Sequence, residues 1–495
     1  MLWIAAILSL ALSGIALYFD PPMLSMDGLY YLKAAEAFLQ HGVKAAFEVY
    51  AWPFYSIFLA SLSRITGFSL ESSAHMIDAL GFVLITVGFV GIVRTLGANR
   101  RVQRWAIGVI LLYPALNIMR KLPILRDYMY WGCFLLAIWA LIVYCRNRTW
   151  RRALAWNAAI FMAVLFRIEG IFLMLLMPLV VLKDTHGDTS SIKTWLRLNI
   201  SLILAGMGAL VWLVMHAASA PVFLARFYTL FNGHILPVIP SAQLSTYMDQ
   251  IRHWFLHGYT GWIAPVGLFI IAVLYFIANF IHSLGIVFLA LAAYGISQGL
   301  IETDASAKCV LRALVVFQVI ILTVFMATQF FVSFRYFMPL NFLLLFYVPF
   351  VLEHVAQKFI TNGREWVLWP PQFFPILMIC LSVLAFNGLY RVHYSKAYIR
   401  TAAAWADTHL PAGARLFSND ARLLYYTNRV GNPVLRLRYY YQKPKHRLLR
   451  HQKYFLISVG HHNLKYAREW QALFKNPPMK TFTGPRGDHV YVWKR

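Results

Sequence analysis

The sequence predicts an all-α polytopic membrane domain followed by a small soluble α/β domain towards the C-terminal end of the chain. Of the 495 residues, 60% are hydrophobic and only 13% are charged, whereas an ordinary soluble domain carries roughly 25% charged residues. The apolar residues also stand in long runs, for example over 1–19, 310–332 and 373–389. Each run approaches the ~20 residues that cross a bilayer as a helix. Helices are expected because they satisfy their own backbone hydrogen bonds in lipid.

Successive apolar segments predict about 11 to 13 transmembrane helices. Residues 1–19 have no basic leading region and no small-residue cleavage pattern, so we expect a retained first helix rather than a removed signal peptide. Later helices are expected over 72–93, 105–119, 127–145, 153–166, 168–182, 197–217, 261–300, 311–332, 336–353 and 371–390. The stretch 261–300 could form either two spans or one span and a surface helix. This choice decides on which side of the membrane each later loop and the C-terminal domain lie.

Arginine-rich turns indicate how the chain is oriented. One short turn holds Arg94, Arg100, Arg101 and Arg104, and another holds Arg146, Arg148, Arg151 and Arg152. Short turns rich in Lys and Arg remain in the cytoplasm. The loop over 20–71 therefore faces the other side, and in a bacterium this is the periplasmic face of the inner membrane.

The net charge of +26 is typical of a membrane protein whose cytoplasmic loops are rich in Lys and Arg and face anionic lipid head groups. The basic residues are scattered and form no nucleic-acid module pattern, so membrane lipids are the expected partners and nucleic acid is not.

Two domains are expected: a membrane domain over 1–390, with surface helices in its outer loop over 20–71, and a soluble α/β domain over 391–495. In the second domain, 395–409 reads as a helix, 411–413 as a turn, and 454–459 and 489–493 as strands.

The outer loop contains an amphipathic helix. One face carries Leu29, Leu32, Ala35, Phe38 and Leu39, and the other carries Lys33, Glu36 and Gln40. This spacing is typical of a helix that lies on a membrane surface. Asp27 stands just before it in the N-cap position, and capping alone would account for an acidic residue there.

Several motifs follow one another in a recognisable order. An apolar first helix leads to an acidic residue in the outer loop, a surface helix that ends in glycine, and a turn over 52–55. Later come Arg126-Asp127 at the start of a helix, Arg-Ile-Glu-Gly over 167–170, Arg-Tyr-Phe-Met-Pro over 335–339, and Leu-Pro-Ala-Gly-Ala-Arg over 410–415. This order resembles the C-type (GT-C) glycosyltransferase superfamily. It is most similar to the bacterial relatives of protein O-mannosyltransferases and of the lipid A aminoarabinose transferase.

The resemblance implies a multi-span enzyme that takes a sugar from a polyprenyl-phosphate carrier, with inversion at the sugar carbon. It makes Asp27 the catalytic acidic residue, Asp127 a second, supporting carboxylate and Glu48 a third candidate. Arg126, Arg167 and Arg335 become lipid-phosphate partners, although arginines at helix ends also anchor to lipid head groups. The family places its C-terminal domain on the outer side, which requires one net crossing over 261–300.

Two positions depart from the family pattern. The outer-loop motif is commonly Asp-Glu, whereas Gly28 follows Asp27 here, and Trp52-Pro53 stands where a His-Pro-Pro turn is often found.

The expected reaction breaks the bond between the sugar C1 and a phosphate oxygen. A carboxylate that deprotonates the attacking hydroxyl is typically worth ~10²–10⁴-fold, and cations stabilise the departing phosphate. A monophosphate carries less charge than a nucleotide diphosphate, so a divalent ion is not obligatory. Glu48 with His234, His253 or His257 could bind one. The acceptor would be a lipid, a glycan or a protein.

The alternative function is a transporter or flippase for a lipid-linked glycan, and a membrane-embedded glycan polymerase is a third hypothesis. Transporters usually show internal repeats and polar sites near mid-membrane. No repeat is visible here, and the acidic residues gather in the outer loops. A polymerase usually carries its main large loop late in the chain rather than directly after the first helix.

Overall fold

The computed structural model describes residues 1–19, 24–183, 191–215, 225, 228, 241–255, 263–329, 332–361, 373–390, 397–411, 413–414, 416–427, 452–461, 464–474, 476–485 and 487–495. The chain divides into two compact units, each described by itself below. Unit 1 comprises Met1–Ala16, Ala51–Arg120 and Arg126–Leu389, and unit 2 comprises Leu17–Tyr50, Lys121–Leu125 and Tyr390–Arg495.

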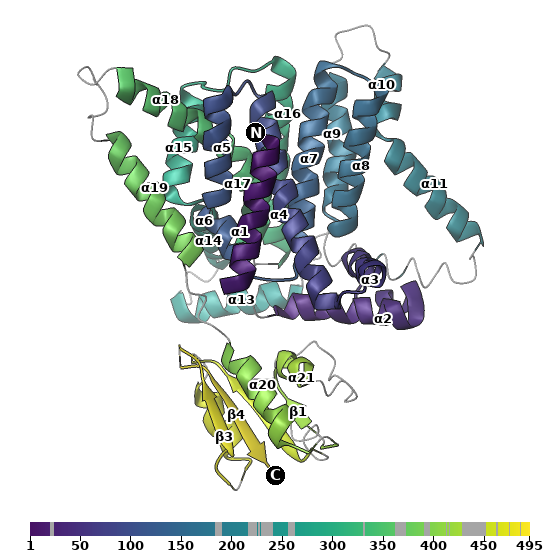
Figure 1. Cartoon of the computed structure of the whole chain (residues 1–495), viewed down its shortest axis with the longest axis vertical. Helices are drawn as coiled ribbons and strands as arrows, with labels where there is room; N and C mark the ends of the chain where they lie inside the picture. Colours follow the sequence, from purple (N-terminus) through teal and green to yellow (C-terminus); the bar gives the residue numbers. More distant parts are fainter. Residues whose placement is uncertain are drawn as a thin grey trace. The chain divides into compact units, whose positions relative to one another are not determined.

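Unit 1 is built from helices (Figure 1). They are α1 (Leu2–Phe19, whose last residues belong to unit 2), α3 (Phe54–Thr66), α4 (Leu70–Thr95), α5 (Arg100–Leu112), α6 (Pro114–Arg120), α7 (Arg126–Arg146), α8 (Trp150–Phe166), α9 (Gly170–Lys183), α10 (Ser191–Leu198), α11 (Ile200–Met215), α13 (Ser241–Phe255), α14 (Ala264–Leu284), α15 (Ile286–Ser297), α16 (Ala305–Gln329), the 3₁₀ turn η2 (Phe334–Phe337), α17 (Met338–Leu345), α18 (Val348–Thr361) and α19 (Phe373–Tyr390).

Glycines let α4 and α7 pack closely as two parallel helices. A Cβ added to Gly81 would lie 2.8 Å from the Cβ of Tyr128, and one added to Gly88 would lie 2.9 Å from that of Leu135. Further along, the indole of Trp139 donates a hydrogen bond to Thr95 at 2.9 Å. Any larger residue at these glycines would force the two helices apart.

Two helices besides α4, namely α8 and α16, run between the two ends of unit 1 that α7 connects. α8 runs antiparallel to α7 after a short turn, so its end at Phe166 returns to the end of unit 1 where α7 begins. α16 starts at the opposite end, because Asp304 just before it forms an ion pair with Arg146 at 2.6 Å. The chain after α16 therefore reaches Arg335 at the same end as Asp127.

The stretch 261–300 contains two helices within its described part. α14 is a 21-residue apolar helix, and α15 has only 12 residues. They meet at Gly285, whose φ of +86° lies in the region that side chains rarely adopt. α14 is long and apolar enough to cross a membrane, whereas α15 is a shorter apolar helix.

Among the described residues, five helices are long and apolar enough to cross a membrane, and the number rises to eight if each of three bent pairs is one span. Three further apolar helices are shorter. The predicted fold class is confirmed: the chain is an α-helical membrane protein with a small C-terminal sheet. The expected 11 to 13 crossings stay a prediction.

Unit 2 combines α2 (Met26–Val49), α20 (Ala397–His409), α21 (Ala421–Tyr426) and α23 (Leu464–Gln471) with four strands. These are β1 (Leu416–Ser418), β2 (Tyr454–Val459), β3 (Lys480–Thr483) and β4 (His489–Lys494), in the order β1-β2-β4-β3. β1 and β2 are parallel, and the other pairs are antiparallel. Both predicted strands are therefore confirmed, and so is the predicted helix over 395–409 in its described part, Ala397–His409.

Candidate active site

A buried cluster of charges lies at one end of unit 1. Asp127, in the first turn of α7, pairs with Arg167 through a short contact between Oδ1 and Nη1. Arg167 also donates from Nη2 to Glu169 Oε1 at 2.8 Å. The side chains of Asp127 and Arg167 are 2% and 7% exposed, so each must have an opposite charge nearby.

Local structure explains why Arg167 and Glu169 share this site. α8 ends at Phe166, and its C-cap residue is Arg167 in extended conformation. α9 begins three residues later at Gly170, where an added Cβ would lie 3.2 Å from the backbone nitrogen of Val164. The tight turn therefore holds both side chains between two helix ends.

Arg335 joins the cluster from the 3₁₀ turn that precedes α17. Its Nη1 lies 3.9 Å from Asp127 Oδ2, and its side chain is 24% exposed, the most open of the four. The ring of Tyr336 lies against both guanidinium groups, 4.8 Å from that of Arg167 and 5.4 Å from that of Arg335. The Arg335 guanidinium is thus more exposed than that of Arg167.

The cluster carries more positive than negative charge. Arg126, Arg167 and Arg335 surround two carboxylates, Asp127 and Glu169. Burial of Glu169 favours its neutral form, but Arg167 and Arg126 outweigh burial and lower the pKa of this carboxyl to about 2. Glu169 is therefore a permanent anion here and a poor general base.

A pocket opens beside these charges. It holds about 420 Å³ of empty space, part of it open to the surroundings, and is lined by Tyr130, Trp131, Arg167, Glu169, Gln318, Ile321, Leu322, Phe325, Arg335, Tyr336 and Pro339. Gln318, in the middle of α16, is 3% exposed. Its amide nitrogen has no hydrogen-bond partner among the described residues. A buried amide of this kind is costly unless a ligand satisfies it.

The Trp52 turn supports the same site. The indole nitrogen of Trp52 donates to the backbone oxygens of Val164 at 3.1 Å and Leu165 at 2.9 Å. It thereby satisfies carbonyl groups at the end of α8, directly before Arg167. This contact is a physical reason for a tryptophan at position 52.

Asp27 lies in unit 2, and one expectation about it was wrong. α2 begins at Met26, and its N-cap is Ser25, whose hydroxyl accepts the Gly28 N–H at 2.9 Å. Asp27 is therefore inside the first turn and is not the cap. The reason is that a serine two residues earlier already supplies the capping oxygen. The Asp27 side chain is half-buried.

The start of α2 is closely packed within unit 2. A Cβ on Gly28 would lie 3.1 Å from the Cβ of Ile124, and Ile124 is fully buried with a φ of +60°. The Leu24 N–H donates to the hydroxyl of Tyr426 at 3.3 Å. A glutamate at Gly28, as in the commoner Asp-Glu motif, would crowd Ile124, which would have to shift by a few tenths of an ångström.

The other predicted site residues are placed as follows. Glu48 is exposed near the end of α2, in unit 2. Arg126 opens α7, as expected. His234 and His257 lie outside the described residues. Within the described residues, no group of three or more His, Cys, Asp or Glu side chains could hold a metal ion.

Sequence reasoning assigned no role to Glu169, Gln318 or Tyr336. Glu169 belongs to the Arg-Ile-Glu-Gly motif over 167–170, in which only Arg167 was given a role. Gln318 was visible as a lone amide in an apolar run, which is a signal for function in a membrane helix. Tyr336 acts through its ring, which no spacing rule predicts.

No protein-family model and no curated protein matches the chain. Among solved structures, the chain is similar to the archaeal oligosaccharyltransferase AglB from Archaeoglobus fulgidus, in complex with an inhibitory peptide and a dolichol-phosphate. The identity is 13% and the TM-score 0.49, over 83% of this chain and 58% of that chain.

The chain is also similar to two structures of the arabinofuranosyltransferase AftD from Mycobacteria, at 16% and 12% identity with TM-scores of 0.46 and 0.47. These matches cover 84% and 100% of this chain and 30% and 40% of those chains. All three structures are of sugar-transferring enzymes by name.

Proposed function

We propose that this protein is a C-type glycosyltransferase that moves a sugar from a polyprenyl-phosphate carrier to an acceptor at the outer, periplasmic membrane face. The observation that carries the proposal is the pocket beside Asp127, Arg167 and Arg335. It combines an excess of guanidinium charge with an apolar wall and an amide that has no partner among the described residues.

Arg335 suits a phosphate that gains charge during the reaction. The donor is a phosphodiester with one negative charge, whereas the released polyprenyl phosphate is a monoester with a charge of about −1.5 to −2 at neutral pH. A fixed cation therefore binds the departing group more strongly than the donor, and this difference accelerates the reaction.

Asp127 has a positioning role in this proposal. Its carboxylate is 2% exposed and faces two guanidinium groups, so it holds their geometry rather than reaching a substrate. Arg167 is similarly engaged by Asp127 and Glu169. Arg335, whose side chain is more exposed than that of Arg167, is therefore the proposed main phosphate partner, with Arg126 as a second one.

Asp27 is the proposed general base. The acceptor hydroxyl attacks C1 of the sugar, its proton passes to the Asp27 carboxylate, and the C1–oxygen bonding pair leaves with the phosphate. A single displacement of this kind inverts the configuration at C1. Because Ser25 caps α2, Asp27 is not required as the cap. No step uses a metal ion.

A comparison of surface glycans tests this function. Cells that lack the protein would be complemented with the wild type, with Asp27→Ala, or with Glu36→Gln, a control that removes another carboxylate from α2. Mass spectrometry should find a sugar-bearing product with the wild type and the control and lose it with Asp27→Ala at equal membrane expression. An unchanged product with Asp27→Ala would refute Asp27 as the base. Carrier-linked sugar that crosses the membrane without being transferred would favour the flippase alternative.

A further inference from the structure

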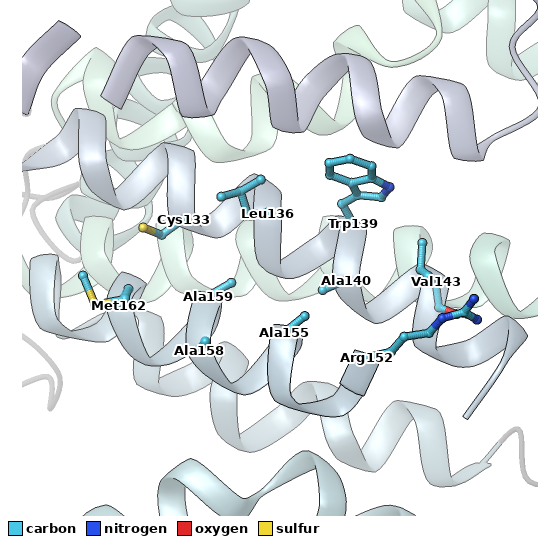
Figure 2. Close-up of a pocket in the computed structure, with 10 residues that line it drawn as sticks. All are labelled: Cys133, Leu136, Trp139, Ala140, Val143, Arg152, Ala155, Ala158, Ala159 and Met162. Carbon is cyan, nitrogen blue, oxygen red and sulfur yellow. The ribbon is translucent and has the colours of Figure 1, made fainter. Parts of the chain in front are cut away.

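An apolar groove runs along α7 and α8 (Figure 2). It is lined by Cys133, Leu136, Trp139, Ala140, Val143, Arg152, Ala155, Ala158, Ala159 and Met162, and it encloses about 1000 Å³ of empty space, part of it open to the surroundings. Arg152 is the only charged residue among these.

Alanines create the groove. Three of the lining residues of α8, Ala155, Ala158 and Ala159, carry a single methyl group, and Ala140 contributes the same on α7. Figure 2 shows Ala155 and Ala159 on the side of α8 that faces α7, with Trp139 farther along α7. Leucine at these positions would fill the space, as leucine does on most membrane-facing helix surfaces.

The length of the groove matches one leaflet of a bilayer. Its lining residues run from Cys133 to Val143 on α7 and from Arg152 to Met162 on α8. Ten residues of helix extend about 15 Å, and the hydrocarbon core of a bilayer is about 30 Å thick. The groove therefore begins at the arginine-rich end and stops near mid-membrane.

A fixed cation lies at the arginine-rich end of this groove. The Arg152 Nη1 donates to the backbone oxygens of Val143 at 3.1 Å and Asn147 at 3.2 Å, which holds the guanidinium in place. Among the described residues, no carboxylate forms an ion pair with Arg152. Arg151 is exposed beside it, and Trp150 is 46% exposed; tryptophan at this depth is typical of the membrane interface.

We propose that this groove binds one acyl chain of an anionic glycerophospholipid, with the head-group phosphate on Arg152. The lipid comes from the leaflet at the arginine-rich end of unit 1. Asp127 and Arg146 lie at opposite ends of α7, about 28 Å apart along the helix. The head-group site at Arg152 is therefore separate from the pocket beside Arg335, and the inference does not depend on the proposed transferase function.

The charge of Arg152 and the shape of the groove make distinct contributions to lipid selectivity. The uncompensated guanidinium selects an anionic head group over a zwitterionic one, and the alanine floor selects a chain that lies flat against two helices. A lipid held by both should survive purification, unlike lipids that merely surround the protein.

Native mass spectrometry of the full chain tests this inference. Delipidated protein would be titrated with phosphatidylglycerol and, separately, with phosphatidylcholine of the same acyl chains. We expect one phosphatidylglycerol to bind at least tenfold more tightly than phosphatidylcholine. Arg152→Gln and Ala158→Phe should each weaken binding at least tenfold, the first by removing the cation and the second by filling the groove.

Matched controls are available on the same membrane faces. Arg104→Gln removes an exposed arginine from α5, and Ala278→Phe enlarges an exposed alanine on α14. Both variants should bind the lipid as the wild type does. If Ala158→Phe folds poorly, Ala155→Leu serves instead. The proposal is overturned if the variants retain wild-type affinity, if both lipids bind equally, if added polyprenyl phosphate displaces the phospholipid, or if a second copy of the chain covers the groove.

Discussion

The side chain of Arg167 contacts two carboxylates, and both belong to residues at or next to the start of a helix. Asp127 stands 40 residues away in the chain and Glu169 only two. The sequence motifs identified all three residues, but not that they meet. A motif reports residue types in order, whereas the pairing depends on α7 and α8 running antiparallel and returning to one end.

Replacing Asp127 tests its positioning role. Asp127→Asn leaves a buried guanidinium with one counter-ion fewer, and removal of one partner from a buried pair typically costs about 3–5 kcal/mol. We expect a clearly lower melting temperature, partly restored by adding Arg167→Gln. Asp249→Asn is the control, since its ion pair with Arg252 on α13 is exposed and should contribute within about 1 kcal/mol. Equal effects of the two aspartate variants would contradict the buried cluster.

Replacing Gln318 should have the opposite effect on stability from replacing Asp127. Gln318→Leu removes a buried amide with no described partner, so the ligand-free protein should gain roughly 1–3 kcal/mol, while the KM for the sugar donor rises because a ligand contact is lost. Gln103→Leu is the control: its amide donates to Ala98 at 3.0 Å, so this variant should lose stability. Thermal unfolding and a transfer assay measure the two effects. Destabilisation by Gln318→Leu would mean that the amide is already satisfied.

At the scale of elements, helix positions were largely predictable and helix ends were not. The apolar runs at 72–93 and 127–145 correspond to α4 and α7 because hydrophobic length alone marks a span. The first residue of α2 could not be predicted from residue type, because serine and aspartate are both good N-caps and Ser25 and Asp27 lie two residues apart. The break at Gly285 needed a backbone angle that glycine permits but does not require.

The start of α2 offers an element-scale test. Gly28→Glu creates the Asp-Glu pair of the superfamily that the sequence resembles, but its side chain would crowd Ile124. Overpacking of this kind typically costs about 1–3 kcal/mol. We expect faster hydrogen exchange of the amides over 24–32 and lower thermal stability. Lys44→Glu, an exposed change on the same helix, should have neither effect. Wild-type exchange in Gly28→Glu would show that the contact with Ile124 is not tight.

For the whole molecule, charge distinguishes the two ends of unit 1. One end carries the arginine-rich turns, and the other brings together Asp127, Arg167 and Arg335 around a pocket. The composition predicted a basic membrane protein, and the turns predicted its orientation. The convergence of α7, the turn before α9 and the turn after α16 could not be predicted, because it depends on contacts between segments up to 208 residues apart.

Transfer by the purified protein tests the central claim most directly. Proteoliposomes would receive a labelled polyprenyl-phosphate sugar and an acceptor that the glycan comparison identifies. Arg335→Gln should lower kcat/KM by roughly 10²–10³-fold, because it removes the cation that stabilises the departing phosphate. Arg312→Gln, which removes an exposed arginine near the other end of α16, should act as the wild type does. Wild-type transfer by Arg335→Gln would contradict the account.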